Sequence, residues 1–134
     1  MSSVRPPAVA GSFYPRSPGQ LENDVSTLLA DAADAARGQP VPKAIIAPHA
    51  GYIYSGSIAA SVYARLVPAR GVITRAVLLG PVHRVPVRGH AFPDADCFIT
   101  TLGPIAADAA AGSALKTMAQ RSGSAAVSRR GHWP

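Results

Sequence analysis

The stretch Lys43-Ala-Ile-Ile-Ala-Pro-His-Ala-Gly-Tyr-Ile-Tyr-Ser-Gly56 carries the strongest structural signal in the chain. Its first five residues form a short apolar run of the kind that makes buried strands in parallel sheets. A loop rich in Gly and Tyr follows. Ile58, Val62 and Leu66 are then spaced by four, which is typical of one face of a helix. The stretch therefore predicts a strand, a loop and, over residues 57–66, a helix.

A second apolar run, Arg75-Ala-Val-Leu-Leu79, follows this helix and predicts the next strand. Strand, helix and strand over this length make a βαβ unit, whose two strands pair in parallel through a right-handed crossover. Two shorter strand-like pieces follow near Gly89–Phe92 and Cys97–Thr101. The predicted fold class is α/β, with a mostly parallel sheet flanked by helices.

An earlier helix is expected to begin after Ser17, which is a good N-cap. Pro18 then takes the first helical position, and Gln20 completes a Ser-x-x-Gln capping box. Gly38 and Pro40 should stop this helix near residue 36. Its apolar face has four members: Leu21, Val25, Leu28 and Leu29.

The composition changes beyond residue 108. Gly112 and Ser113 are expected to interrupt any helix that begins near residue 106, and residues 120–131 show no periodicity. We therefore divide the chain into residues 1–108, half of an α/β domain, and residues 109–134, an atypical basic tail that is disordered or a frameshift product. The strands found do not close a doubly wound sheet, so we expect the fold to be incomplete and the gene product truncated.

The net charge of +6 suggests a nucleic-acid partner, but its distribution disfavours one. The tail holds four basic residues and no acidic one, and no aromatic residues alternate with basic ones as in single-strand binders. The longest uncharged run, residues 44–64, is broken by Pro48 and Gly51, so no membrane span is expected. The single cysteine, Cys97, excludes an intramolecular disulfide and points to a cytoplasmic location.

Each of the two predicted strands ends in a Pro-His turn, at Pro48-His49 and at Pro81-Val-His83. The carboxyl ends of neighbouring parallel strands lie on one sheet edge, about 4.8 Å apart. Both imidazoles could therefore reach one metal ion, at roughly 2.0–2.1 Å if the ion were zinc. Alternatively, each histidine is a structural residue with satisfied hydrogen bonds. Two ligands do not fill a tetrahedral site.

Tyr52, Tyr54 and Ser55 follow the first histidine and precede the predicted helix. Backbone N–H groups at a helix N-terminus, with serine hydroxyls, can hold an anionic ligand group. Alternatively, the glycines permit a tight turn and the tyrosines pack beside it. Cys97 is expected to be a small core residue and His90 a polar residue on a strand.

Four blocks of the sequence resemble successive blocks of the Memo family, the AmmeMemoRadiSam system protein B family. They are Arg5-Pro-Pro-Ala-Val-Ala-Gly-Ser-Phe-Tyr-Pro15, Ile46-Ala-Pro-His-Ala-Gly-Tyr-Ile-Tyr-Ser-Gly56, Leu79-Gly-Pro-Val-His-Arg-Val-Pro86 and Thr101-Leu-Gly103. The resemblance covers roughly residues 4–108 and stops near residue 110. It implies a fold similar to that of the class III extradiol dioxygenases, which hold non-haem iron.

By this resemblance, His49 and His83 match the first two histidines of the family's metal site. In the family a cysteine from the C-terminal half completes that site, and Cys97 does not match it. Val82 stands where the family usually has serine, and Arg84 where it usually has a second histidine. A cation beside His83 disfavours the binding of a positive ion.

These observations predict a Memo-like protein with a dioxygenase-like metal-site remnant at two strand ends, impaired or inactive as truncated. The metal would be iron, copper or zinc, and the activity at most that of a metal-dependent, oxidoreductase-like protein. No catalytic residue is assigned. The alternative is a non-catalytic binding module that recognises a peptide or small anion in the same cleft.

Overall fold

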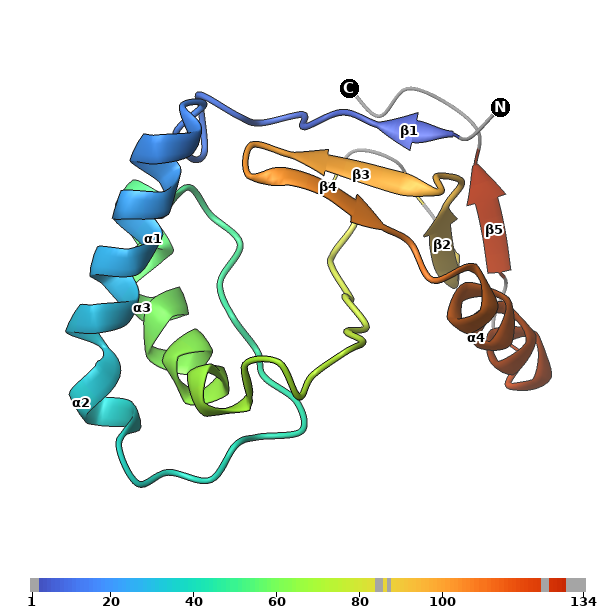
Figure 1. Ribbon diagram of the computed structural model, residues 1–134. Helices are drawn as coiled ribbons and strands as arrows, with labels where there is room; N and C mark the ends of the chain where they lie inside the picture. The colour runs from blue at the N-terminus through green and yellow to red at the C-terminus, as the bar shows by residue number, and fades with distance from the viewer. Residues whose placement is uncertain (1–2, 84–85, 87, 124–125, 130–134) are drawn as a thin grey trace. The chain divides into compact units, whose positions relative to one another are not determined.

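The computed structural model describes residues 3–83, 86, 88–123 and 126–129, and the chain divides into two compact units. The helical unit is Val9–Val77, and the sheet unit comprises Met1–Ala8 and Leu78–Pro134. Helices occupy the first and short strands with one helix the second (Figure 1). The fold is therefore mixed α/β with a small sheet, which confirms the predicted class.

The helical unit contains helices α1 (Pro18–Asp31), α2 (Ala33–Ala36) and α3 (Tyr52–Tyr63), followed by the 3₁₀ helix η1 (Ala64–Ala69). α1 and α3 pack side by side (Figure 1).

Helix α1 begins at Pro18, as predicted, because the fixed φ of proline suits the first helical position. The predicted capping box is wrong: the Ser17 side chain caps none of the described amides. Its backbone carbonyl instead accepts from Leu21 N at 3.0 Å. The helical segment ends near residue 36, as predicted, since Gly38 turns the chain at φ 72°.

Helix α3 begins at Tyr52, five residues before the predicted start. The Gly- and Tyr-rich stretch is thus the first turns of the helix and not a loop. The sequence predicts Gly56 in the loop, whereas the structure has it on the helix face that meets α1. A Cβ atom on Gly56 would lie 3.0 Å from Leu28 Cδ1, so glycine there permits close packing.

The core of the helical unit is small. Its buried apolar residues are Leu21, Ala60, Ala64 and Ala69. No large side chain among the described residues is fully buried. Of the predicted apolar face of α1, Leu21 is 6% exposed, and Val25, Leu28 and Leu29 are half-buried.

The sheet unit contains two small sheets. In the first, β3 (Cys97–Thr100) lies between β1 (Val4–Arg5), which is parallel to it, and β4 (Gly103–Ala106), which is antiparallel. In the second, β2 (His90–Pro93) pairs in parallel with β5 (Ala126–Arg129). β2 and β3 confirm the two shorter predicted strands, and His90 begins a strand as expected.

The two strands predicted at Lys43–Ala47 and Arg75–Leu79 are wrong, because neither segment belongs to a strand. Ile46 is 96%, Leu78 87% and Leu79 84% exposed. A parallel strand needs neighbours that accept its backbone hydrogen bonds and layers that cover both faces. Among the described residues, no strand pairs with either run. The apolar residues of each run are therefore not enough to form a strand.

Helix α4 (Ala109–Arg121) lies within the predicted tail. The expected interruption at Gly112 and Ser113 is wrong, since both lie inside this helix. Asp108 caps it by accepting a hydrogen bond from Ala111 N at 2.9 Å. Ser113 Oγ donates to the Ala109 carbonyl at 2.9 Å. The tail's residues 124–125 and 130–134 lie outside the described residues, and a domain boundary at 108 stays a prediction.

Candidate ligand-binding pocket

A pocket of about 500 Å³ lies within the helical unit. Four segments line it: the turn at residues 9–14, the apolar face of α1, residues 48–50, and the face of α3 that carries Tyr52 and Tyr63. Its lining is mostly apolar, with a few polar groups from His49, Ser55 and three tyrosines. Pockets that hold small organic ligands usually have this size and character.

The turn at residues 9–14 forms one wall because it folds back on itself. Gly11 adopts φ 89°, which glycine tolerates without strain, and its N–H donates to the Tyr14 carbonyl at 2.7 Å. Phe13 N and Ser12 Oγ both donate to the Val9 carbonyl, at 2.9 Å each. These bonds fix the positions of Phe13 and Tyr14 beside α3.

Hydrogen bonds connect the segment after His49 to the turn at residues 9–14 and to helix α3. Tyr52 N donates to the Phe13 carbonyl at 2.8 Å, so the first amide of α3 is bonded to the turn. Ser55 Oγ lies 3.0 Å from the Ala50 carbonyl and 3.4 Å from that of Gly51, and Ser55 is buried. These contacts hold the chain on the C-terminal side of His49 against the helix and so keep the histidine at the pocket wall.

Three tyrosines line the pocket. Tyr52 and Tyr63 are eleven residues apart on α3 and therefore share one face of the helix. Tyr14 approaches from the turn, with its ring centroid 6.0 Å from that of Tyr52 and the planes inclined at 45°. Burial raises the pKa of Tyr52 above its usual 10.0, and the neighbouring hydroxyls of Tyr14 and Tyr63 raise it further. Tyr52 is therefore a neutral phenol at physiological pH.

Three of the five predicted site residues, His49, Tyr52 and Ser55, line this pocket together. Tyr54 is 83% exposed and is not part of the lining. His83 belongs to the sheet unit and is exposed.

The lining also includes Phe13, Tyr14 and Tyr63, which are not among the site residues predicted from the sequence. A helix that begins at Tyr52 has Tyr63 on the same face, eleven residues later, so this spacing is the signal that identifies Tyr63.

The described residues contain no group of three or more His, Cys, Asp or Glu side chains that could hold a metal ion. Cys97, in β3, is half-buried, and His90 is exposed at the start of β2. Val82, at the position where the resemblance implies serine, is 45% exposed. Arg84 lies outside the described residues. The donor set that the structure describes therefore does not form a complete metal centre.

The geometry at the start of α3 gives little support to the predicted anion site. The Tyr52 N–H and the Ser55 hydroxyl are both engaged by backbone carbonyls. No Lys or Arg is among the described residues that line the pocket. An anionic ligand here stays a prediction.

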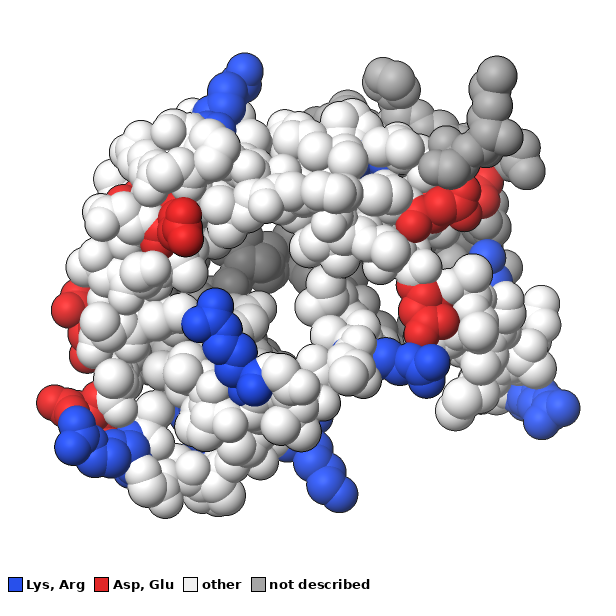
Figure 2. Space-filling view, in the orientation of Figure 1, with Lys and Arg blue, Asp and Glu red and all other residues white. Residues whose placement is uncertain are grey.

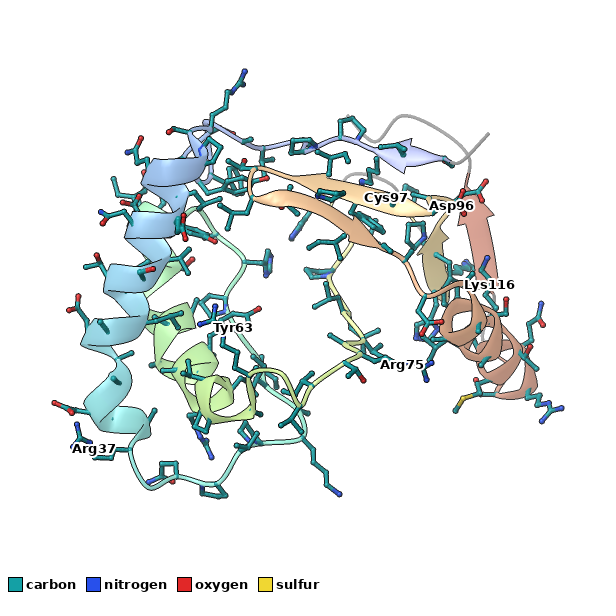
Figure 3. The ribbon with its side chains drawn as sticks, viewed as in Figure 1. Arg37, Tyr63, Arg75, Asp96, Cys97 and Lys116 are labelled. Atoms are coloured by element: carbon teal, nitrogen blue, oxygen red, sulfur yellow. The ribbon has the colours of Figure 1, made fainter. Side chains whose placement is uncertain are left out.

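Charge is unevenly spread over the helical unit. Between residues 17 and 36 the chain has four acidic residues and no Lys or Arg, namely Glu22, Asp24, Asp31 and Asp34. Glu22, Asp31 and Asp34 are exposed and Asp24 is half-buried. Red acidic atoms lie along the side of the molecule where Figure 1 shows α1 and α2 (Figure 2). Arg37 follows α2 and pairs with Asp34 at 2.7 Å (Figure 3). One wall of the pocket thus belongs to an acidic helix.

Within the described part of the chain, no helix has the length and apolar character needed to cross a membrane.

Comparison with known proteins identifies the family. The family model described as "Memo-like protein" matches residues 5–130. A MEMO1 family protein of Aquifex aeolicus (strain VF5) is 46% identical over 80 residues, which are 60% of this chain and 27% of that protein. Protein MEMO1 of Mus musculus is 40% identical over 93 residues, 69% of this chain and 30% of that protein. The chain belongs to the Memo-like family.

The match to the family model runs past residue 108 and includes α4, so the expected end of the resemblance near residue 110 is wrong. Protein MEMO1 of Xenopus laevis is 39% identical over 101 residues, 75% of this chain and 32% of that protein. The chain spans about a third of the length of the relatives that it matches.

Proposed function

We propose that the helical unit is a ligand-binding element of a Memo-like protein, and that the pocket between α1 and α3 is its binding site. One observation carries this proposal: His49, Tyr52 and Ser55, which the sequence marks as site residues, line one pocket of about 500 Å³. A mostly apolar pocket with a few convergent polar groups is the usual form of a small-molecule site.

The proposed ligand is a small organic molecule or a short peptide. Its apolar part would contact the face of α1, where Val25, Leu28 and Leu29 lie. Its polar part would contact His49 and the tyrosine hydroxyls. Tyr54 is exposed and would contact only a ligand long enough to extend beyond the lining, such as a peptide.

Binding is tested on the full chain by amide NMR, with indole as the small organic probe and the tripeptide Ala-Tyr-Ala as the peptide probe. The expected result is chemical-shift change at residues 48–60 that saturates with the probe. His49→Ala should weaken binding, and His90→Ala, a histidine of the sheet unit, should leave it unchanged. Tyr54→Ala should weaken only the peptide. Shifts that are absent, or equal in both histidine variants, would contradict the proposal.

We also propose that His49 and His83 supply two ligands of a metal site, for iron, copper or zinc. The support is the family membership together with the two Pro-His turns. The described residues do not fit a complete centre, because two imidazoles fill only half of a tetrahedral zinc site. The chain alone is therefore expected to bind metal weakly and to be impaired in any metal-dependent activity.

A zinc titration followed by calorimetry tests this second proposal. The expected affinity is weak, with a dissociation constant that rises on either His49→Ala or His83→Ala and stays constant on His90→Ala. Tight zinc binding that survives both substitutions would sink the assignment. A cytoplasmic location, inferred from the single cysteine, remains a prediction that imaging of the tagged chain would check.

A further inference from the structure

We infer that the pocket prefers ligands that carry an alkylated ammonium group, which the tyrosine rings would bind by cation–π attraction. This inference rests on the proposed function, since it names the class of ligand that the same pocket takes. Two features support it: the aromatic rings that line the pocket and the lack of basic side chains among the described lining residues.

The ring arrangement suits a cation. Cations bind over aromatic faces within about 6 Å of the ring centroid. The rings of Tyr14 and Tyr52 lie together in the lining, with centroids 6.0 Å apart and planes inclined at 45°. Tyr63 and Phe13 also line the pocket. Aromatic side chains grouped in this way recognise quaternary ammonium ligands.

The pocket lining gives an anion little electrostatic support. No Lys or Arg is among the described lining residues, so an anion would lack a permanently charged partner. Helix α1 forms a wall and, with α2, carries four carboxylates without a basic residue between positions 17 and 36. Arg65 and Arg70 lie in and after η1, outside the lining. Arg16 lies beside the turn at residues 9–14 and donates from Nη2 to the Ala10 carbonyl at 3.1 Å, and residues 9–77 hold six Lys or Arg against four Asp or Glu. The charge beyond the lining therefore does not by itself select a cation.

The hydroxyl groups do not favour an anion either. Ser55 Oγ already donates to backbone carbonyls of the segment at residues 50–51. The tyrosine hydroxyls can donate a hydrogen bond, which is a weaker anchor for an anion than a charged side chain. An alkylated ammonium needs no donor and gains from the ring faces and the apolar wall.

The first test uses a matched pair of probes, choline and its neutral isostere 3,3-dimethyl-1-butanol, titrated into the full chain and followed by amide NMR. Cation–π attraction in a partly desolvated site predicts that choline binds roughly tenfold more tightly than the isostere. Equal affinities would overturn the inference and leave the pocket as a ligand site. Tighter binding of acetate than of choline would also overturn it, in favour of an anion.

The second test uses matched variants at one ring. Tyr14→Phe keeps the aromatic face and removes the hydroxyl, whereas Tyr14→Leu keeps the volume roughly and removes the face. Choline affinity should survive the first change and fall about tenfold on the second. Equal losses in both variants would indicate hydrogen bonding and overturn the inference. Tyr54→Leu, outside the lining, is the control, and dispersed amide spectra verify that each variant is folded.

The two proposals fail in different ways. If indole binds at residues 48–60 and choline does not, the pocket stands and the ammonium preference is wrong. If neither indole, the tripeptide nor choline binds to a folded chain, both the proposed function and this inference are wrong.

Discussion

The apolar face of α1 and the run Arg75–Leu79 have a similar apolar character in the sequence and opposite environments in the structure. Leu21 on α1 is 6% exposed, whereas Leu79 is 84% exposed. A helix satisfies its backbone hydrogen bonds internally, so one packed neighbour is enough to bury its apolar face. A strand needs hydrogen-bonding partners along its edges as well. The difference shows that an apolar run yields structure only where the rest of its layer is present.

The largest expected effect comes from truncating these two leucines. Leu21→Ala should lower the free energy of unfolding by about 2 kcal/mol or more, because it removes a buried side chain from a small core. Leu79→Ala should change it by less than about 0.5 kcal/mol, since that side chain is already in water. Urea titrations followed by the amide peaks of α1 measure both. Equal losses would show that the run around Leu79 is packed in solution.

A second contrast involves glycines in two helices. Gly56→Val should destabilise the helical unit by about 1–3 kcal/mol, because even a Cβ there would lie 3.0 Å from Leu28 Cδ1. At Gly112 in α4 a Cβ would meet nothing within 4 Å, so Gly112→Val should be neutral within about 0.5 kcal/mol.

The same urea titration measures the free energy of unfolding of both variants. A neutral Gly56→Val variant would mean that α1 and α3 are farther apart than the structure places them.

The two helix starts give a smaller difference. Asp108 accepts a hydrogen bond from Ala111 N, so Asp108→Ala should cost about 1 kcal/mol and increase fraying of α4. Ser17→Ala should cost little, because the Ser17 side chain makes no cap bond to the described amides. Amide hydrogen exchange at the first turn of each helix measures the effect. Faster exchange in the Ser17 variant alone would mean that Ser17, and not Asp108, caps its helix.

The smallest expected effect is a pH dependence. Burial and the nearby Tyr14 and Tyr63 raise the pKa of Tyr52 in the folded chain. The neutral phenol therefore stabilises the fold fully below the unfolded pKa of 10.0, and this contribution is lost as pH rises through the higher folded value.

Urea midpoints at about pH 8 and about pH 11 should differ less in Tyr52→Phe than in the unchanged chain. Since Tyr52 is 39% exposed, the difference will be small. If Tyr52→Phe leaves the difference between the two urea midpoints unchanged, Tyr52 is not the source of the pH dependence.

The sequence predicted those parts of the fold whose causes are local. The start of α1 followed from Pro18 and its end from Gly38, and the short strands β2 and β3 were found at their places. The runs at residues 43–47 and 75–79 were misjudged because strand formation depends on neighbours that no local pattern reveals. The start of α3 differs from the prediction because glycine in a sequence indicates a loop, whereas Gly56 serves close packing against Leu28.

For the candidate site, the sequence predicted His49, Tyr52 and Ser55, which follow one another closely in a distinctive stretch. It did not predict Tyr14, which reaches the pocket only because the turn at residues 9–14 docks on the start of α3. That docking joins residues far apart in the chain, and no spacing rule anticipates it. His83 lies in the sheet unit, and its role as a metal ligand stays a prediction.

The hydrogen bond from Tyr52 N to the Phe13 carbonyl has a consequence for the order of folding events. First-turn amides of a helix lack an acceptor within the helix and normally exchange rapidly with solvent. The Tyr52 amide acquires one only when the turn has docked, which closes a chain segment that includes all of α1. In refolding, protection of this amide therefore requires the docked turn and not the formation of α1 alone.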